Sequence, residues 1–297
     1  SETINYSFIG PRAFERAAIP EGHPLRRALP LANPLSAEMS LMRTTLIPGL
    51  LENALLNQNR RRGSLRLFEL GMVFRPKVSQ DSSRPELPQE VRMLAALASA
   101  EPPSGPWPEN REPLDFFFMK GVVEQLLEAL RLPRGEFEPA AEPYLEPFSA
   151  ARLLVGGECL GLLGRLSQEA LDSSALREPF FLLELNFERL TSLSKGVPQA
   201  KVLPRYPATL RDIALIVDRD VAASRIEETI RQAVPELLRE VRLFDFYEGR
   251  GIPAGKRSLA FSLAYRADDR TLTDEEVSQA HARVVRRIEE ELGARLR

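Results

Sequence analysis

The run from Arg257 to Arg266 alternates strictly between large and small side chains. The large residues are Leu259, Phe261, Leu263 and Tyr265, and the small residues are Ser258, Ala260, Ser262 and Ala264. Because successive residues of a β-strand point to opposite faces, one face of this strand is bulky and apolar and the other is flat. The bulky face suits burial under helices, while the flat face can stay accessible. The run therefore predicts a strand in a sheet that is covered on one side only.

The neighbouring segments complete a β-α-β-β-α-β pattern within the last 97 residues. We expect strands at 211–218, 240–247, 257–266 and 294–297, and helices at 223–234 and 274–292. In the first helix, Ile226, Ile230 and Val234 recur every four residues, which places them on one face. Thr273 and Glu276 form a capping-box pattern at the start of the second. The pattern predicts an open four-stranded sheet backed by two helices.

Strict alternation in the strand 240–247 divides its side chains into two sets. One face would carry Arg242, Phe244 and Phe246, and the other Val241, Leu243, Asp245 and Tyr247. If the second face is the open one, the Tyr247 ring can stack on a nucleotide base, and Asp245 can accept hydrogen bonds from base edges. Ser258, a small hydroxyl residue, would permit close approach. The pattern alone equally allows Tyr247 to be a half-buried aromatic residue of the sheet.

Charge limits how this chain can bind nucleic acid. The formal net charge is −2, and the last 97 residues hold 18 Lys and Arg against 17 Asp and Glu. RNA binding would therefore depend on a local basic patch and on stacking, rather than on the overall field. The candidate phosphate contacts are Arg211, Arg257, Arg295 and Arg297. The pattern is equally compatible with solvated surface arginines at these positions. We interpret the acidic cluster at 268–276 as loop charge and first-turn helix acids, not as a cation site.

Cysteine and histidine offer few candidates for chemistry. Cys159 is the only cysteine, which excludes a disulfide framework, and we expect it to be a small buried hydrophobic residue. His281 lies on the buried face of the last helix and is interpreted as a core histidine. His23 lies in a proline-rich loop without an evident partner. The sequence shows no signal peptide or long apolar span, so we expect a cytoplasmic protein. The start at Ser1, without Met, suggests a fragment or a processed chain.

Residues 1–191 predict a separate mixed α/β module with antiparallel strands. The expected elements are strands at 1–9, 65–75, 92–98, 151–155, 159–166 and 180–187, helices at 46–61 and 116–130, and loops at 77–90 and 100–113. Pro48 is tolerated only in a first turn, so the first helix should begin near Leu46 or Ile47. Gly156 and Gly157 predict a hairpin turn. A linker at 192–204 would connect this module to a domain at 205–297.

Several motifs of the first module resemble the β subunit of bacterial phenylalanyl-tRNA synthetase. They are 33–36 (Asn-Pro-Leu-Ser), 42–51 (Met-Arg-Thr-Thr-Leu-Ile-Pro-Gly-Leu-Leu) and 68–74 (Phe-Glu-Leu-Gly-Met-Val-Phe). The C-terminal part independently resembles the ferredoxin-like anticodon-binding domain of the same subunit. Its motifs are 203–207 (Leu-Pro-Arg-Tyr-Pro), 211–214 (Arg-Asp-Ile-Ala), 244–249 (Phe-Asp-Phe-Tyr-Glu-Gly) and 256–260 (Lys-Arg-Ser-Leu-Ala). Together the two resemblances cover nearly the whole chain.

The resemblance implies an α+β protein in which a class II synthetase-like module without its own chemistry precedes the ferredoxin-like βαββαβ domain. It implies that Asp245, Tyr247 and Ser258 contact the anticodon of tRNA(Phe). The catalytic site would lie on an α subunit, in an α₂β₂ enzyme that esterifies tRNA with phenylalanine using ATP and magnesium. This chain would hold neither cofactor, and the editing domain and acidic magnesium-binding cluster of the family would lie upstream.

Two other functions are left open by the residues themselves. An autonomous class II ligase would need two phosphate-binding arginines, for which Arg66 and Arg165 are the nearest matches, although both depart from the expected motif order. We interpret both as ordinary strand residues. The third possibility is a module that binds only protein. The helix 46–61 is expected to pack within the module and at the contact between subunits, where Asn57, Gln58, Asn59 and Arg60 would supply polar partners.

Overall fold

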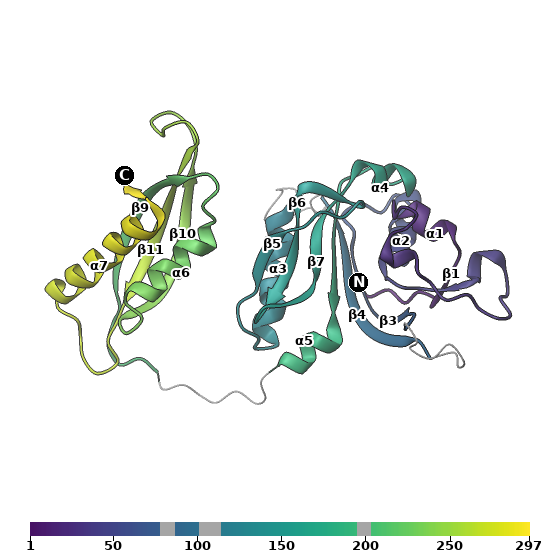
Figure 1. Ribbon diagram of the computed structural model, residues 1–297, viewed down its shortest axis with the longest axis horizontal. Coiled ribbons are helices and arrows are strands. Elements are labelled where there is room, and N and C mark those ends of the chain that lie inside the picture. The colour runs from purple at the N-terminus through teal and green to yellow at the C-terminus, as the bar shows by residue number, and fades with distance from the viewer. Residues whose placement is uncertain (78–86, 101–113, 195–202) are drawn as a thin grey trace. The chain divides into compact units, whose positions relative to one another are not determined.

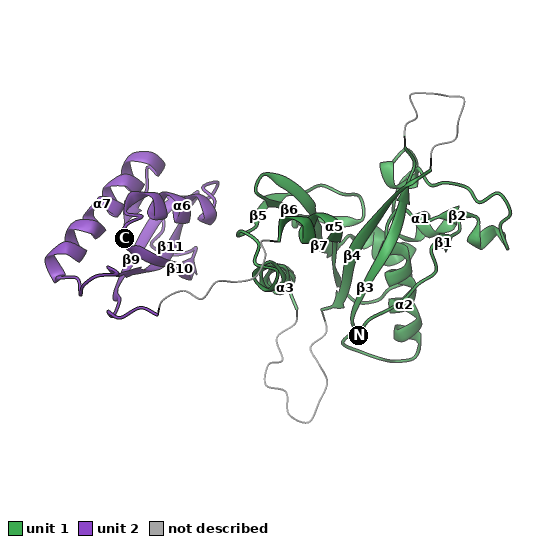
Figure 2. Cartoon of the chain, turned by 90° about the horizontal axis from the view of Figure 1, so that it is seen from below, with its two compact units in different colours: residues 1–197 green, residues 198–297 purple. Residues whose placement is uncertain are grey.

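The computed structural model describes residues 1–77, 87–100, 114–194 and 203–297 (Figure 1). The chain divides into two compact units, residues 1–197 and 198–297 (Figure 2). Each unit buries its own hydrophobic clusters, and we describe each by itself. Most of the linker predicted at 192–204, and most of the loops predicted at 77–90 and 100–113, lie outside the described residues. The predicted domain boundaries therefore stay predictions.

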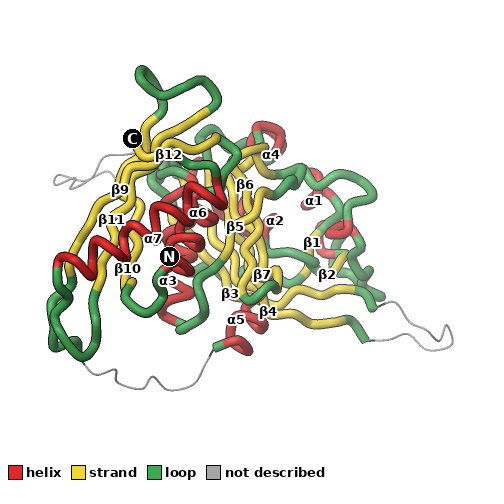
Figure 3. Tube along the Cα trace, turned by 60° about the vertical axis from the view of Figure 1, so that its left-hand side comes forward, coloured by secondary structure: helices red, strands yellow, loops and turns green. Residues whose placement is uncertain are grey.

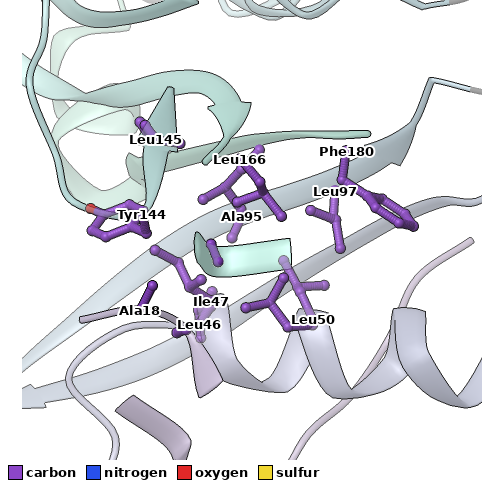
Figure 4. Close-up of a cluster of buried hydrophobic side chains, with 14 of the residues drawn as sticks. Ala18, Leu46, Ile47, Leu50, Ala95, Leu97, Tyr144, Leu145, Leu166 and Phe180 are labelled. Carbon is purple, nitrogen blue, oxygen red and sulfur yellow. The ribbon is translucent and has the colours of Figure 1, made fainter. Parts of the chain in front are cut away.

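Unit 1 is organised around a six-stranded antiparallel sheet. Its strand order is β3 (Arg66–Arg75), β4 (Gln89–Ser99), β8 (Phe180–Asn186), β7 (Glu158–Leu166), β6 (Leu145–Val155) and β5 (Glu136–Pro139). Helix α2 (Ile47–Asn59) covers one face of the sheet and helix α3 (Phe116–Ala129) covers the other. Figure 4 shows Leu50 of α2 near Leu97 of β4 in the first of these cores. The mixed α/β architecture with antiparallel strands is confirmed.

Smaller elements complete unit 1. They are β1 (Phe8–Ile9), β2 (Leu41–Met42), α1 (Arg12–Arg16), α4 (Gln168–Ser173), α5 (Phe187–Leu193) and two single turns of 3₁₀ helix, η1 (Pro24–Arg26) and η2 (Ala37–Met39). Helix α5 was not predicted. It begins because the Asn186 side chain accepts a hydrogen bond from the Arg189 amide and so caps the helix N-terminus. Pro48 does lie in the first turn of α2, as expected.

The strand predicted at residues 1–9 is wrong for most of its length. Only Phe8 and Ile9 form a strand, paired with β2. The first residues instead run beside β3 in a parallel bridge between Glu2 and Phe68, with the Thr3 amide donating to the Phe68 carbonyl at 2.8 Å. The alternating pattern of this segment reflects extended backbone, but its neighbours in the fold decide where regular pairing forms.

Unit 2 is the predicted open sheet with two helices. Its strand order is β10 (Leu238–Tyr247), β11 (Lys256–Tyr265), β9 (Thr209–Asp218) and β12 (Arg295–Leu296). Helices α6 (Ala223–Ala233) and α7 (Asp274–Leu292) lie on one side of this sheet (Figure 3). The large residues of β11 pack against both helices in one core, which confirms the expectation from their alternation. The capping box at Thr273 is present, and Gly293 ends α7 with φ 60°.

The structure places Cys159, His23 and His281 in three different environments. Cys159 is exposed rather than buried, because it lies beside the tight turn at Gly156 and Gly157, where the hairpin of β6 and β7 leaves the core. His23 has a partner after all, since its Nε2 lies 3.2 Å from an Oε2 of Glu142, which is remote in sequence. His281 is half-buried and contacts the Tyr265 hydroxyl at 3.2 Å.

Among the described residues, no helix combines the length and apolarity needed to cross a membrane.

Candidate nucleic-acid interface

A β-bulge in strand β10 decides which side chains reach the uncovered face of the sheet. Before the bulge, Leu243 lies opposite Phe261 of β11, and after it Asp245 lies opposite Ala260. Phe244 is the extra residue, and it has no partner in the ladder. After the bulge, each side chain of β10 points to the face opposite from the one that uninterrupted alternation would give it. The prediction of strict alternation through β10 is therefore wrong.

The exchange places Asp245 and Tyr247 on the face away from the helices. Tyr247 lies opposite Ser258, and Asp245 lies opposite Ala260, both of which belong to the small set of β11. Phe246 lies opposite the buried Leu259 and so points to the helix side. Leu243 also lies on the helix side, whereas strict alternation had grouped it with Tyr247. Tyr247 and Phe246 point to opposite faces, as expected, because regular alternation resumes after the bulge.

The Tyr247 ring is fixed at the edge of the uncovered face. Its hydroxyl donates to the Arg250 carbonyl at 3.2 Å, and the side chain remains 36% exposed. Gly249, at φ 153°, allows this placement, because a Cβ built there would lie 2.9 Å from the Tyr247 hydroxyl. The guanidinium of Arg297 lies 5.4 Å from the ring centroid. The ring is outside the helix-covered core and carries a cation over its face.

Small residues form the floor of the face. Ser258, Ala260 and Ala264 are nearly buried, although no helix covers this side of β11. They are short side chains on a central strand, so the larger residues of β10 and β9 stand above them. Ser258 is 3% exposed. Ser258 is therefore recessed in the floor of the face, opposite Tyr247, and its contact with the anticodon stays a prediction.

The predicted arginines divide between the two sides of the sheet. The Arg297 amide donates to the Ala214 carbonyl at 3.0 Å, which attaches the C-terminal strand to β9 on the side of Tyr247. Arg295 lies opposite Ile216, and Ile216 lies opposite Ser258. Both Arg295 and Arg297 therefore belong to the uncovered face.

Arg211 and Arg257 do not belong to that face. Arg211 lies opposite Leu263 and pairs with Asp274 of α7 at 3.3 Å. Arg257 donates to the Val221 carbonyl at 2.7 Å on the helix side. The register of β9 with β11 turns both side chains toward the helices, so these two candidate phosphate contacts lie apart from Asp245 and Tyr247. The structure brings together Asp245, Tyr247, Ser258 and Arg297.

Arg242 was not among the predicted site residues, although it lies on the uncovered face. It is exposed and lies opposite Ser262 of β11, on the same face as Tyr247. Strict alternation had placed it with Phe246 on the other face. An arginine within a strand that also holds aromatic residues was the available signal in the sequence. The bulge, which the sequence does not reveal, decides that this arginine shares a face with Tyr247.

The two arginines considered for a nucleotide-binding site each contact another side chain of unit 1. The Arg66 guanidinium lies 5.3 Å from the Phe118 ring, and Arg165 pairs with Glu146 at 3.0 Å. The register places two strands, β4 and β8, between them. Three strand spacings correspond to about 14 Å. The interpretation of both as ordinary strand residues is favoured.

The opposite face of the same sheet is closed by buried polar contacts. Glu69 accepts from Arg43 at 2.7 Å, and Glu184 accepts from the Thr45 hydroxyl at 2.7 Å and from the Leu46 amide at 2.7 Å. Burial raises the pKa of the Glu184 carboxyl, and the two hydrogen bonds and the nearby arginines oppose that shift only partly. These hydrogen bonds join the segment before α2, and the start of the helix, to the sheet.

The polar end of α2 is used within the chain. The Gln58 side chain donates to the Ala175 carbonyl at 3.0 Å and accepts from the Arg177 amide at 2.8 Å. Asn57 donates to the Asn53 carbonyl at 2.8 Å. The helix packs within the module, as expected, but Gln58 is not free to serve as a polar partner between subunits.

Comparisons with known proteins agree with this geometry. Residues 1–187 match the family described as the phenylalanyl tRNA synthetase beta chain CLM domain, and residues 204–297 match the ferredoxin-fold anticodon binding domain. The whole chain is 41% identical over 298 residues to the phenylalanine–tRNA ligase beta subunit of Moorella thermoacetica. It is 43% identical over 300 residues to that of Symbiobacterium thermophilum.

The chain covers 36% of the Moorella protein and 33% of the Symbiobacterium protein, so it spans about a third of the length of these relatives. Among solved structures, pyrrolysyl-tRNA synthetase from Desulfitobacterium hafniense aligns with a TM-score of 0.48 at 18% identity. That alignment covers 64% of this chain and 61% of the other.

Proposed function

The chain belongs to the phenylalanyl-tRNA synthetase beta chain family, and we propose that it is the part of the β subunit that binds the anticodon region of tRNA(Phe) and supports assembly with the catalytic subunit. The domain at 204–297, which belongs to an anticodon-binding family, carries the RNA-binding role. Unit 1 carries the assembly role and performs no aminoacylation itself.

The proposal depends above all on Tyr247 and Asp245 lying together on the uncovered face of unit 2. An aromatic ring at the edge of a sheet can stack on an unpaired base, which typically contributes about 1–3 kcal/mol. The carboxylate of Asp245 attracts donors on a base edge and repels phosphate, so it favours one orientation of the base. Arg242, Arg295 and Arg297 supply positive charge on the same face. Stacking, base reading and phosphate binding are thus available in one place.

The complete enzyme would supply what this chain lacks. A catalytic α subunit binds ATP, magnesium and phenylalanine, and two copies of each subunit assemble in the cytoplasm. The contacts of these arginines support this division of labour, because Arg66 lies over the Phe118 ring and Arg165 pairs with Glu146. The role of this chain is to hold the tRNA and to contact the catalytic subunit.

Kinetics of the reconstituted α₂β₂ enzyme test this proposal. The Tyr247→Ala enzyme should show impaired tRNA aminoacylation, with a raised KM for tRNA(Phe). Its ATP–pyrophosphate exchange with phenylalanine should stay close to wild type, because activation takes place on the other subunit. Phe148→Ala, which removes an exposed aromatic ring of unit 1, is a matched control for tRNA binding. Exchange activity by the isolated chain that Arg66→Ala abolishes would instead establish an autonomous ligase.

A further inference from the structure

The Phe246 ring lies on the helix side of unit 2 but outside its core. Phe246 lies opposite the buried Leu259 of β11, yet it is 53% exposed and does not belong to the hydrophobic cluster beneath α6 and α7. Figure 1 shows that β10 and β11 run on beyond the ends of both helices to the loop that joins them. The ring therefore lies on a part of the sheet that the helices leave uncovered.

A guanidinium lies over this ring, as one does over the Tyr247 ring. The Arg257 guanidinium lies 6.0 Å from the centroid of the Phe246 ring. Arg257 is a diagonal neighbour of Phe246 across the two strands, since it precedes Leu259 by two residues. The Arg297 guanidinium has the same relation to the Tyr247 ring, at 5.4 Å. Two successive residues of β10 thus each present a ring paired with an arginine, one on each side of the sheet.

The charge of Arg257 is not neutralised by a carboxylate of the described residues. Its Nη2 donates to the Val221 carbonyl at 2.7 Å, and its Nε is buried without an acceptor. Glu248, which follows Tyr247, pairs instead with Arg219 at 2.8 Å. The Arg257 guanidinium can therefore attract a phosphate to the Phe246 side of the strand.

Strand β10 lies at the edge of the sheet, so an RNA strand can pass around it. Its neighbour on one side is β11, and none of the described strands pairs with its other side. Phe246 and Tyr247 are successive residues, so their side chains point to opposite faces from positions about 3.3 Å apart along the strand. RNA whose base stacks on Tyr247 can cross this free edge and bring an adjacent base to Phe246.

Two bulges make the same edge unsuited to pairing with a strand of another protein. The register of β10 shifts between Leu238 and Glu240, and again between Leu243 and Asp245. Bulges twist an edge strand and interrupt its row of hydrogen-bonding groups, which protects against strand addition. Stacking on an exposed ring needs no regular backbone. The bulges and the unpaired arginine therefore favour RNA over a protein strand as the occupant.

We propose that Phe246 and Arg257 form a second stacking site for single-stranded RNA, which takes a nucleotide adjacent to the one stacked on Tyr247. This inference rests on the proposed function, because that function brings the anticodon loop to the end of β10. The base stacks on the face of the Phe246 ring that Arg257 leaves open, and Arg257 contacts the phosphate of the same nucleotide. The RNA then holds the edge of β10 from both sides.

Stem-loops that lack single bases test which ring holds which nucleotide. The full chain is titrated with labelled tRNA(Phe) anticodon stem-loops in which one loop nucleotide at a time is abasic. For the wild type, base removal at each of two adjacent positions should weaken binding by about 5–150-fold, the range for one stacked base. In Phe246→Ala, base removal at one of these positions should have no further effect, while the effect at the other remains. Tyr247→Ala should show the reverse.

Substitutions of Phe246 separate stacking from apolar packing. Phe246→Trp keeps an aromatic face and should bind within a few-fold of wild type, whereas Phe246→Leu should lose nearly as much affinity as Phe246→Ala. Phe244→Ala is the matched control, because Phe244 is 49% exposed in the same strand and has no arginine over its ring among the described residues. It should keep the wild-type response to every abasic stem-loop. Arg257→Gln should reduce the slope of log affinity against log salt by about 0.7–1.

Two results would overturn the proposal. If Phe246→Ala keeps the wild-type affinity and the wild-type response to every abasic stem-loop, the ring binds no base, and its exposure serves a protein contact instead. If Phe246→Ala weakens all stem-loops by one common factor, the ring supports the shape of β10 and not a nucleotide. In both cases the proposed function survives, provided that Tyr247→Ala still removes the effect of one base. Absence of that Tyr247 effect would contradict the proposed function itself.

Discussion

The guanidinium of Arg297 lies 5.4 Å from the centroid of the Tyr247 ring, although strands β11 and β9 separate the two residues in the sheet. The C-terminal arginine therefore extends across the uncovered face and occupies one side of the ring. An arriving base must stack on the other side of the ring or displace the guanidinium. Under the proposed function, the guanidinium would then contact a phosphate of the bound RNA.

This relationship predicts a defined salt dependence for Arg297. Arg297→Ala should weaken binding of the anticodon stem-loop and reduce the slope of log affinity against log salt by about 0.7–1, the amount expected for one lost phosphate contact. Arg297→Lys should restore the slope. Titrations of the chain with a labelled stem-loop at four salt concentrations measure this. An identical slope for wild type and Arg297→Ala would show that the arginine only caps the ring.

Gly249 and Gly251 provide a matched pair for testing the position of the ring. Both have positive φ, 153° and 94°, but a Cβ at Gly249 would meet the Tyr247 hydroxyl, whereas a Cβ at Gly251 meets nothing within 4 Å. Gly249→Ala should therefore displace the ring and weaken stem-loop binding several-fold. Gly251→Ala should carry backbone strain alone, of order 1–3 kcal/mol, and keep near wild-type affinity. Equal loss of binding in both variants would point to strain in the loop instead.

The buried Glu184 predicts a pH dependence of stability. Because burial raises its pKa in the folded chain, the folded state keeps a proton that the unfolded state has already released. Stability should therefore fall as the pH rises above the unfolded value near 4.5, by up to about 1.4 kcal/mol per pH unit until the folded carboxyl also ionises.

Glu184→Gln should remove this fall, since the amide oxygen can still accept from Thr45 and Leu46. Urea unfolding of both proteins at pH 5 and pH 8 measures the difference. A wild type whose stability does not decrease relative to Glu184→Gln between these pH values would show that the carboxyl is ionised in the fold.

Local sequence patterns predicted the structure correctly where it depends on residues that are close together in the sequence. The alternation in β11 and the capping box at Thr273 each depend on a few adjacent residues, and both were predicted. Pro48 in the first turn of α2 follows from the geometry of proline. The order of elements in unit 2 could therefore be predicted from its sequence.

The errors arose where distant residues decide the structure. The bulge at Phe244 exists only in relation to β11, so a single strand read by itself could not reveal that Arg242 and Tyr247 share a face. The helix-side positions of Arg211 and Arg257 depend on the register of two strands. The contact between His23 and Glu142 joins two loops of unit 1 that are far apart in the sequence. None of these relationships leaves a periodic signal in the sequence.

The central claim is that the uncovered face of unit 2 binds the anticodon through the Tyr247 ring. Fluorescence anisotropy of a labelled tRNA(Phe) anticodon stem-loop, titrated with the wild-type, Tyr247→Ala and Tyr247→Phe chains, tests it directly. The account predicts that Tyr247→Ala weakens binding by about 5–150-fold, the equivalent of one stacked base, while Tyr247→Phe, which keeps the ring, stays within a few-fold of wild type. Equal affinities for wild type and Tyr247→Ala would contradict it.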